Sequence, residues 1–386
     1  MNGTTFEDQN DESDNTPLTP GRMAEFFGFI KSLRGFGGDL SAITAPAFIL
    51  SPTSLTEFPS YWCEDPYLFV APAKEGSKVL RALAVLKWYL STLRAEWSKQ
   101  RGMKRKPLNA ILGELFLAHR EDGENGKTEL VVEQVSHHPP ITAYHIRNEK
   151  YKVTLEGYHR QKTYFRGRPC IDRIGHVLLH LDAFDEDYLV TLPGLRLEGL
   201  IPPPPYPEIE GRNYIVGGNG IMAEIEYSGR AWLRGKKNSF HAKLYHEGHA
   251  GSPLFTVRGQ WVGGAFTIYD SARRPIEVVD TAAARNLPAM VVKPLEEQGP
   301  LESRRVWHKV SEAIKQGETS TASREKHKIE EEQRALRRKE QAEGIERQPR
   351  YFKLGEWRQA EKLLAKAGMD IRREETKGIW RWVGGQ

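Results

Sequence analysis

The chain has 386 residues, of which 39% are hydrophobic and 10% aromatic, and its formal net charge is +5. This indicates a globular protein with one large domain or two ordinary ones, and no apolar run is long enough for a transmembrane helix. Only two cysteines, Cys63 and Cys170, are present, which excludes a disulfide framework and a cysteine-rich metal site and fits a reducing cytosol. The mild positive charge suits contact with an anionic membrane surface.

Residues 1–20 are acidic and polar and do not resemble a signal peptide, so we expect a disordered tail. Residues 21–50 should form a lid, because apolar side chains recur there at helical spacing on one face: Met23, Phe26, Phe27, Ile30 and Leu33. Gly35, Gly37 and Gly38 would supply a hinge. The helix either packs permanently on the core or alternates between covering an apolar cavity and touching a bilayer.

Residues 51–105 are predicted to be mainly helical. Apolar residues recur at intervals of four and three over residues 77–97, which predicts a helix with one buried face: Val79, Leu83, Leu86, Leu90, Leu93 and Trp97. The basic stretch 99–106 then leads into Lys106-Pro107-Leu108-Asn109, with Gly113-Glu114 shortly after. Taken alone, this segment is a basic loop that enters a strand.

The stretch 133–140 reads Glu-Gln-Val-Ser-His-His-Pro-Pro and follows three apolar residues. Its prolines fix φ and lack N–H groups, so they should end a strand or lie at its edge. Neighbouring side chains of an extended chain point to opposite faces, so His137 and His138 can reach one ligand only if the backbone turns there. The simplest alternative is a turn with two exposed imidazoles.

Residues 106–290 are predicted to be a β-rich core. Polar and apolar residues alternate at 152–156, 223–227 and 240–244, and further strands are expected near 176–181, 188–192, 212–216, 230–234, 254–262 and 265–270. Consecutive strands without helices between them imply antiparallel pairing, and closure would remove the sheet edges. More than eight strands make a barrel too wide for side chains to fill. We therefore expect an α+β fold dominated by a large, nearly closed antiparallel β-barrel that encloses a lipid tunnel, with an N-terminal lid helix and C-terminal helices.

The proline-rich segment 200–207 is either a rigid connector or a ligand for a proline-recognition domain. Residues 291–386 should be helical, with helices over 303–316, 319–343 and about 355–367, and with the aromatic residues of 380–382 docked on the core. Lys326, Glu330 and Arg334 are spaced at i, i+4 and i+8 and form one stripe on the second helix. Without other information, this stripe is an exposed ladder of ion pairs.

The octapeptide 133–140 resembles, at every position, the signature of the oxysterol-binding protein family of lipid-exchange proteins. Lys106–Asn109 with the following Gly-Glu is similar to the second motif of this family. Residues 38–62 and 293–304 also resemble family segments, the first of them that of short, single-domain, yeast-type members. The resemblance covers residues 20–352 and implies one lipid at a time in a tunnel.

In this family the histidine pair, the Lys and Asn of the second motif, and a Lys-Glu-Arg trio before a Gln-Arg step surround an inositol phosphate headgroup. Here Gln333-Arg334 supplies that step. The resemblance thus implies a headgroup site for phosphatidylinositol 4-phosphate made by Lys106, Asn109, His137, His138, Lys326, Glu330 and Arg334. A phosphate monoester carries about −1.5 to −2 charges at neutral pH and needs several such donors.

The resemblance implies a sterol (ergosterol, cholesterol or an oxysterol) as the second ligand. The positions that serve the sterol hydroxyl in relatives correspond here to Glu96, Trp97, His159 and Arg173. Relatives have smaller amides and a Tyr at these positions. We also expect Trp62 to line the tunnel. A buried Glu96 would need Arg173 or His159 as a partner. These replacements leave another lipid, such as phosphatidylserine, open.

The predicted function is exchange of the two lipids between membranes by a monomeric cytoplasmic protein that binds intracellular membranes peripherally and transiently. The alternatives are a phosphoinositide-responsive regulator without a second ligand and a hydrolase that uses the histidine pair. We expect no enzyme, because the sequence has no nucleophile elbow, P-loop, zinc signature or dinucleotide-binding turn. No cofactor, metal or nucleic acid is expected either, since the basic runs 99–106 and 334–339 are short.

Overall fold

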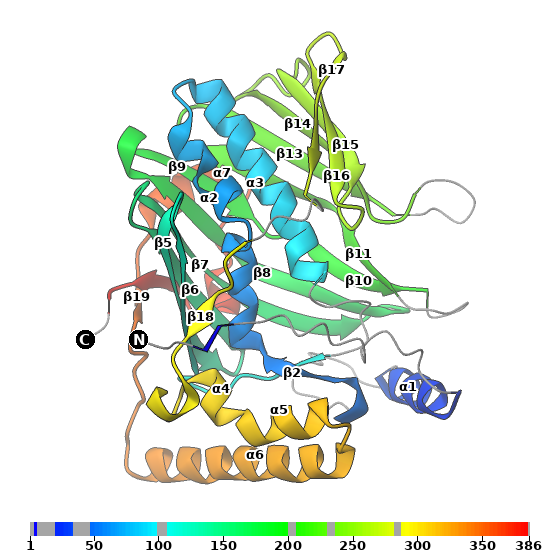
Figure 1. Cartoon of the computed structure of the whole chain (residues 1–386), viewed down its shortest axis with the longest axis vertical. Coiled ribbons are helices and arrows are strands. Elements are labelled where there is room, and N and C mark those ends of the chain that lie inside the picture. The colour runs from blue at the N-terminus through cyan, green and yellow to red at the C-terminus, as the bar shows by residue number, and fades with distance from the viewer. Residues whose placement is uncertain are drawn as a thin grey trace.

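The computed structural model describes residues 4–5, 20–33, 47–98, 106–199, 206–229, 236–281 and 287–384. Its principal helices are α1 (Pro20–Leu33), α2 (Pro66–Lys74), α3 (Lys78–Ser98), α4 (Ser303–Val306), α5 (His308–Lys315), α6 (Thr319–Ala342) and α7 (Arg358–Lys366), with a 3₁₀ segment η4 at Leu55–Cys63. Figure 1 shows α4, α5 and α6 in one layer at the lower end of the molecule.

The strands preceding residue 200 are β1 (Thr4–Thr5), β2 (Leu50–Ser54), β3 (Lys106–Leu108), β4 (Leu115–Asp122), β5 (Gly126–His137), β6 (Pro140–Asn148), β7 (Val153–Phe165), β8 (Pro169–Leu181), β9 (Glu186–Thr191) and β10 (Gly194–Glu198). The later strands are β11 (Tyr206–Glu210), β12 (Arg212–Gly217), β13 (Ile221–Ser228), β14 (Ser239–His246), β15 (Phe255–Gln260), β16 (Ala265–Asp270), β17 (Pro275–Asp280), β18 (Val291–Val292), β19 (Phe352–Gly355) and β20 (Ile379–Trp382).

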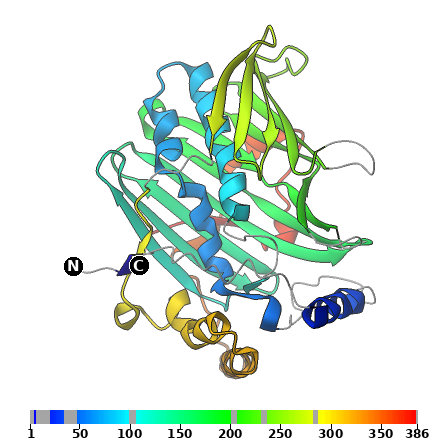
Figure 2. The same ribbon diagram turned by 45° about the vertical axis from the view of Figure 1, so that its right-hand side comes forward.

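Sixteen of these strands form one antiparallel sheet, whose main path runs β1-β18-β4-β5-β6-β7-β8-β9-β12-β13-β14-β15-β16-β17. The predicted large antiparallel sheet is therefore confirmed, and strands occur at each predicted position except 230–234, which lies outside the described residues. Within the described residues no pairing joins β1 to β17, so closure into a barrel is not shown. The sheet nevertheless curves strongly around α2 and α3 (Figure 2).

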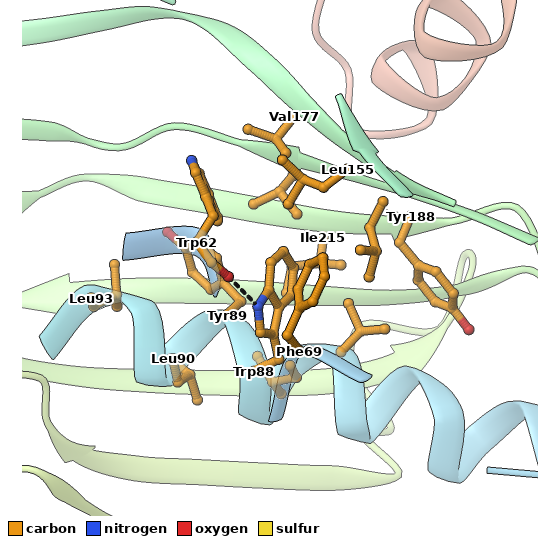
Figure 3. Close-up of a cluster of buried hydrophobic side chains, with 14 of the residues drawn as sticks. Trp62, Phe69, Trp88, Tyr89, Leu90, Leu93, Leu155, Val177, Tyr188 and Ile215 are labelled. Carbon is orange, nitrogen blue, oxygen red and sulfur yellow. Dashed lines mark hydrogen bonds between the residues drawn. The ribbon is translucent and has the colours of Figure 1, made fainter. Parts of the chain in front are cut away.

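Helix α3 lies on the concave side of the sheet, where its apolar face is buried. The predicted stripe is confirmed at Leu83, Leu86, Leu90 and Leu93, whereas the side chain of Trp97 lies outside the described set. These leucines pack among inward-facing strand residues such as Leu155 and Val177 (Figure 3). Each fully buried side chain of this size contributes ~1.5–3 kcal/mol, so α3 anchors the interior.

The C-terminal region differs from the predicted helices in two ways. One helix was expected over 303–316, but the chain forms α4 and α5 with a break at Trp307, whose indole N–H donates to Glu114 at 2.9 Å. The strands β19 and β20, which are separated in the chain by α7, pair as a two-stranded antiparallel sheet that helical periodicity did not predict. The predicted docking of the terminal aromatics is confirmed, because Trp380 is buried and Trp382 stacks on His145 at 4.2 Å.

The amphipathic helix predicted within residues 21–50 is present as α1. Its Phe26 and Ile30 are buried in a cluster with Leu50, Leu108 and Ile314, while Phe27 is partly buried against it. The side chains of Met23 and Leu33, the glycine hinge, and most of the acidic tail and the proline-rich loop lie outside the described residues. No described helix is both long and apolar enough to cross a bilayer.

Two short strands lie where the sequence suggested other structure. Thr4–Thr5, within the expected disordered tail, pairs with β18, and β18 itself belongs to the large sheet although it falls in the region expected to be helical. Extended two-residue segments carry no periodicity from which they could be predicted.

Candidate functional site

The histidine pair lies at a hairpin turn. β5 ends at His137, His138 and Pro139 form the turn, and Pro140 begins β6, which confirms that the backbone turns at the prolines. The register of the two strands shifts between Gln134 and Ser136, and such a bulge re-aims the side chains that follow it. The two imidazole rings consequently lie edge to face with their centroids 4.6 Å apart.

The other polar residues of the octapeptide hold this turn in place. The buried carboxylate of Glu133 accepts the backbone N–H groups of Arg350 at 2.7 Å and Tyr351 at 2.8 Å. The Gln134 side chain donates to the Ser136 carbonyl at 3.0 Å and accepts from Thr142 at 2.7 Å. Glu133 and Gln134 therefore position the histidines and do not face a ligand themselves.

The segment after β3 is hydrogen-bonded directly to the octapeptide. Gly113 N–H donates to the Gln134 carbonyl at 2.9 Å, and Gln134 N–H donates to the Glu114 carbonyl at 2.9 Å. His137 Nδ1–H donates to the Ala110 carbonyl at 3.1 Å, which leaves Nε2 of His137 to face a ligand. The two sequence motifs thus form one unit.

Glu114 is the buried centre of this unit. Its carboxylate accepts hydrogen bonds from Thr56 at 2.8 Å, from the Ile111 N–H at 2.9 Å, from Trp307 at 2.9 Å and from Ser54. Burial raises the pKa of Glu114, and the four donors oppose that rise. Glu114 joins β2, η4, the segment after β3 and the start of α5, and so fixes the place of Lys106 and Asn109. The sequence alone gave no role for this residue.

Helix α6 brings the Lys-Glu-Arg trio to the same end of the molecule. Lys326 is 7% exposed and is ion-paired with Glu330. The pKa of Lys106 falls to about 8, first because of burial and then because of the Lys326 charge, against the effect of Glu330. The ammonium groups of Lys106 and Lys326 thus lie near each other in a poorly solvated place, where Glu330 is ion-paired with Lys326, and an anion would stabilise this arrangement. Arg334 lies at the exposed edge, ion-paired with Glu331 and 3.9 Å from Glu330.

Cations also surround the histidines. The pKa of His137 falls to about 4, first through burial and then through the charges of His138 and Arg337, although Glu330 opposes the fall. The pKa of His138 falls for the same first reason and through Arg337 and Lys377. Both lowered pKa values favour the neutral imidazoles at pH 7. Arg337 and Lys377 were missed in the sequence, where nothing linked them to the histidines.

The second predicted group lies inside the curved sheet. Arg173 Nη1 donates to both carboxylate oxygens of Glu96, at 2.8 and 2.9 Å, and Arg173 Nε donates to the Pro193 carbonyl at 3.0 Å. Both side chains are buried, so the predicted pairing of Glu96 is confirmed with Arg173, not with His159. Burial raises the pKa of Glu96, and Arg173 opposes that rise.

Aromatic side chains adjoin this pair. Trp62 stacks on Tyr144 with 6.4 Å between ring centroids, and Tyr144 meets His159 edge to face at 5.7 Å. Trp88 donates to the Trp62 carbonyl at 2.9 Å, which fixes the backbone of that residue (Figure 3). Two buried polar atoms of this group have no hydrogen-bond partner among the described residues, namely His159 Nδ1 and Arg173 Nη2, whereas the side chains of Trp62 and Tyr144 interact with each other. Buried polar atoms are nearly always paired, so His159 Nδ1 and Arg173 Nη2 mark a candidate polar end for a ligand.

Residues 28–315 match the family model described as oxysterol-binding protein. Protein kes1 of Schizosaccharomyces pombe is 39% identical over 386 aligned residues, which cover 98% of this chain and 99% of that protein. The Osh1 ORD domain solved in complex with ergosterol aligns with a TM-score of 0.70 at 22% identity, covering 89% of this chain and 84% of that one. The Osh3 ORD of Saccharomyces cerevisiae, solved in complex with PI(4)P, aligns with a TM-score of 0.69 at 19% identity. This alignment covers 93% of this chain and 90% of that one. These matches extend through both motifs and almost the whole sheet, and the chain belongs to the oxysterol-binding protein family.

Proposed function

We propose that this protein binds phosphatidylinositol 4-phosphate and a sterol in turn, and exchanges them between membranes. The observation that carries the proposal is the charged cluster near the β5–β6 turn, where Glu330, ion-paired with the buried Lys326, acts on both His137 and Lys106. Relatives of the same fold were solved with ergosterol, cholesterol and PI(4)P, which supports the same two ligand classes here.

The headgroup would satisfy the charges of this cluster. A phosphate monoester near His137 and His138 favours their protonated forms, so binding would raise the two lowered pKa values and gain charge-assisted hydrogen bonds. Lys106 and Lys326 would hold the remaining phosphate, while Glu330 accepts an inositol hydroxyl. Asn109 would add a neutral donor and Arg334 a charge at the rim.

The second ligand is inferred from the polar end near Glu96. Because Glu96 and Arg173 neutralise each other, a neutral lipid fits this end better than a charged headgroup such as that of phosphatidylserine, whose net charge would be buried without a counter-ion. Arg173 Nη2 is a donor only, so the ligand must offer an acceptor oxygen. A sterol hydroxyl meets both conditions, and its own proton would go to His159 Nδ1, which burial keeps neutral by lowering that pKa to about 3.

Transport also needs a cover over the apolar ligand. Moving some twenty sterol carbons into water costs more than about 10 kcal/mol at ~0.8 kcal/mol per methylene. The helix α1, held by Phe26 and Ile30, is the proposed lid, which would open on contact with a membrane surface. We propose a cytoplasmic monomer that associates with intracellular membranes only during exchange and catalyses no reaction.

The test compares wild type with His137→Ala/His138→Ala in transfer between two vesicle populations, one carrying phosphatidylinositol 4-phosphate and the other a fluorescent sterol. The double variant should lose phosphoinositide extraction on the order of tenfold or more and should still extract sterol. Phosphoinositide extraction without any sterol transfer would favour the sensor alternative, and turnover of the phosphoinositide would favour the hydrolase. Failure of wild type to extract phosphoinositide refutes the proposal.

A further inference from the structure

Helix α6 places a second guanidinium on the face that carries Lys326. At 3.6 residues per turn, Arg337 follows Lys326 by about three turns, which puts the two within roughly 20° of each other around the axis. Arg334 is rotated by roughly 80° from Lys326 on the same scale. The burial agrees, because Lys326 is buried and Arg337 half-buried, whereas the Arg334 side chain is 47% exposed.

The two guanidinium groups also differ in their partners. Arg334 is engaged by Glu331 and lies near Glu330. Arg337 makes no hydrogen bond or ion pair with any residue that the structure describes, although it is half-buried. Its neighbour Arg338 is exposed to solvent on another face of the helix. Of the three arginines, Arg337 therefore has the capacity to bind an external anion close to the protein body.

The direction of Arg337 is given by the histidines. Its charge lowers the pKa of His137 and of His138, so the guanidinium lies near both imidazoles. The other charged groups that act on these imidazoles are Glu330 for His137 and Lys377 for His138. In the free protein the positive charges of Arg337 and Lys377 oppose protonation of the imidazoles. A dianion placed among these groups would be attracted by all of them and would favour protonation.

We propose that Arg337 binds the phosphate monoester of the lipid headgroup together with His137 and His138. The inference rests on the proposed function and adds a residue to its site. A planar guanidinium can donate two parallel hydrogen bonds to one phosphate, which the two single-nitrogen donors of the imidazoles cannot do. Arg337 should therefore distinguish phosphatidylinositol 4-phosphate from unphosphorylated phosphatidylinositol.

The test uses the full chain with Arg337→Gln, and Arg338→Gln as the matched control, because the control makes the same charge change at the next position. Extraction of phosphatidylinositol 4-phosphate and of phosphatidylinositol is measured from phosphatidylcholine vesicles. Arg337→Gln should weaken extraction of the phosphorylated lipid on the order of tenfold and leave the other lipid unchanged, whereas Arg338→Gln should change neither. Arg337→Lys should recover only part of the loss, since it restores the charge without the fork.

A second readout is NMR titration of His137 and His138 in the lipid-free protein, where Arg337→Gln should raise both pKa values and Arg338→Gln should not. Equal losses of extraction in the two glutamine variants would assign the effect to general attraction to the vesicle and overturn the inference. The inference is also overturned if Arg337→Gln extracts the phosphorylated lipid as well as wild type does while His137→Ala/His138→Ala has lost this extraction. That second result would leave the proposed function intact. If wild type extracts no phosphoinositide, the proposed function and this inference fail together.

Discussion

The ion pair between Glu96 and Arg173 makes a strong prediction about stability. Arg173→Met removes the guanidinium but keeps most of the side-chain volume, and it leaves the Glu96 carboxylate, which is 8% exposed, without its bidentate partner. Unit charges about 4 Å apart attract by ~4 kcal/mol at an effective dielectric constant near 20. Breaking one side of a buried pair costs ~3–5 kcal/mol, and we expect a loss in that range from the free energy of unfolding.

The double variant Glu96→Leu/Arg173→Met distinguishes the loss of the whole ion pair from the loss of one partner. Because both charges disappear together, the desolvation of each is avoided, and apolar replacements of buried pairs are often neutral or stabilising. We expect the double variant to lie within ~1 kcal/mol of wild type and to unfold later than either single variant. Its binding of a hydroxylated sterol should still weaken, since Arg173 Nη2 no longer donates.

The assay is urea unfolding followed by circular dichroism at pH 7 and at pH 5. Without Arg173, burial alone acts on Glu96 and its pKa in the folded protein rises further above the ordinary value of 4.5. The penalty is therefore present at neutral pH, shrinks as the pH falls through the raised pKa of the folded protein, and disappears below 4.5, where the carboxyl is protonated in both states. A loss below ~1 kcal/mol in Arg173→Met, or a double variant as unstable as the sum of the singles, would refute the reasoning.

Two further predictions concern buried groups outside the ligand contacts. Glu114→Ala leaves four donors without an acceptor, at ~1–3 kcal/mol each where water cannot enter, so we expect at least ~3 kcal/mol of destabilisation in urea unfolding. A change below ~1 kcal/mol would contradict the central role of Glu114. Burial lowers the pKa of His176 to about 3, so the unfolded chain binds a proton from pH 6.5 downward while the folded chain does not. As the pH falls from 6.5 toward 3, the free energy of unfolding should therefore decrease by ~1.4 kcal/mol per pH unit through this one group. His176→Leu should reduce the pH dependence by that slope. An unchanged slope would exclude the histidine as its source.

The elements that the sequence predicted are those governed by local rules. The helix over 77–97 was found because its leucines recur every three or four residues, and the turn at His138 because proline cannot continue a ladder. The antiparallel sheet followed from consecutive strands without intervening helices. The register bulge at Gln134–Ser136, which brings the imidazoles together, could not be predicted, because it depends on pairing with β6.

Residues with long-range roles were missed for a related reason. Glu114 connects segments that are far apart in the sequence, and neither its four donors nor the break that places Trp307 beside it leaves a local pattern. Arg337 could have been found, because its spacing of eleven residues from Lys326 completes three helical turns. That spacing gains meaning only when the hairpin turn is known to face the same side of α6.

The two proposed ligand ends have opposite electrostatic character, and this suggests how one protein would keep its ligands apart. Near the β5–β6 turn, the charges of Lys106, Lys326 and Arg337 outnumber that of Glu330, so an anionic head would offset their repulsion. Inside the sheet, Glu96 and Arg173 already neutralise each other, and a second net charge would be buried at high cost. A phosphoinositide would therefore keep its head at the turn, whereas a sterol gains nothing there and can place its hydroxyl inside. Removing a charge from the inner end alone, as Arg173→Met does, should therefore alter sterol binding and leave headgroup binding intact.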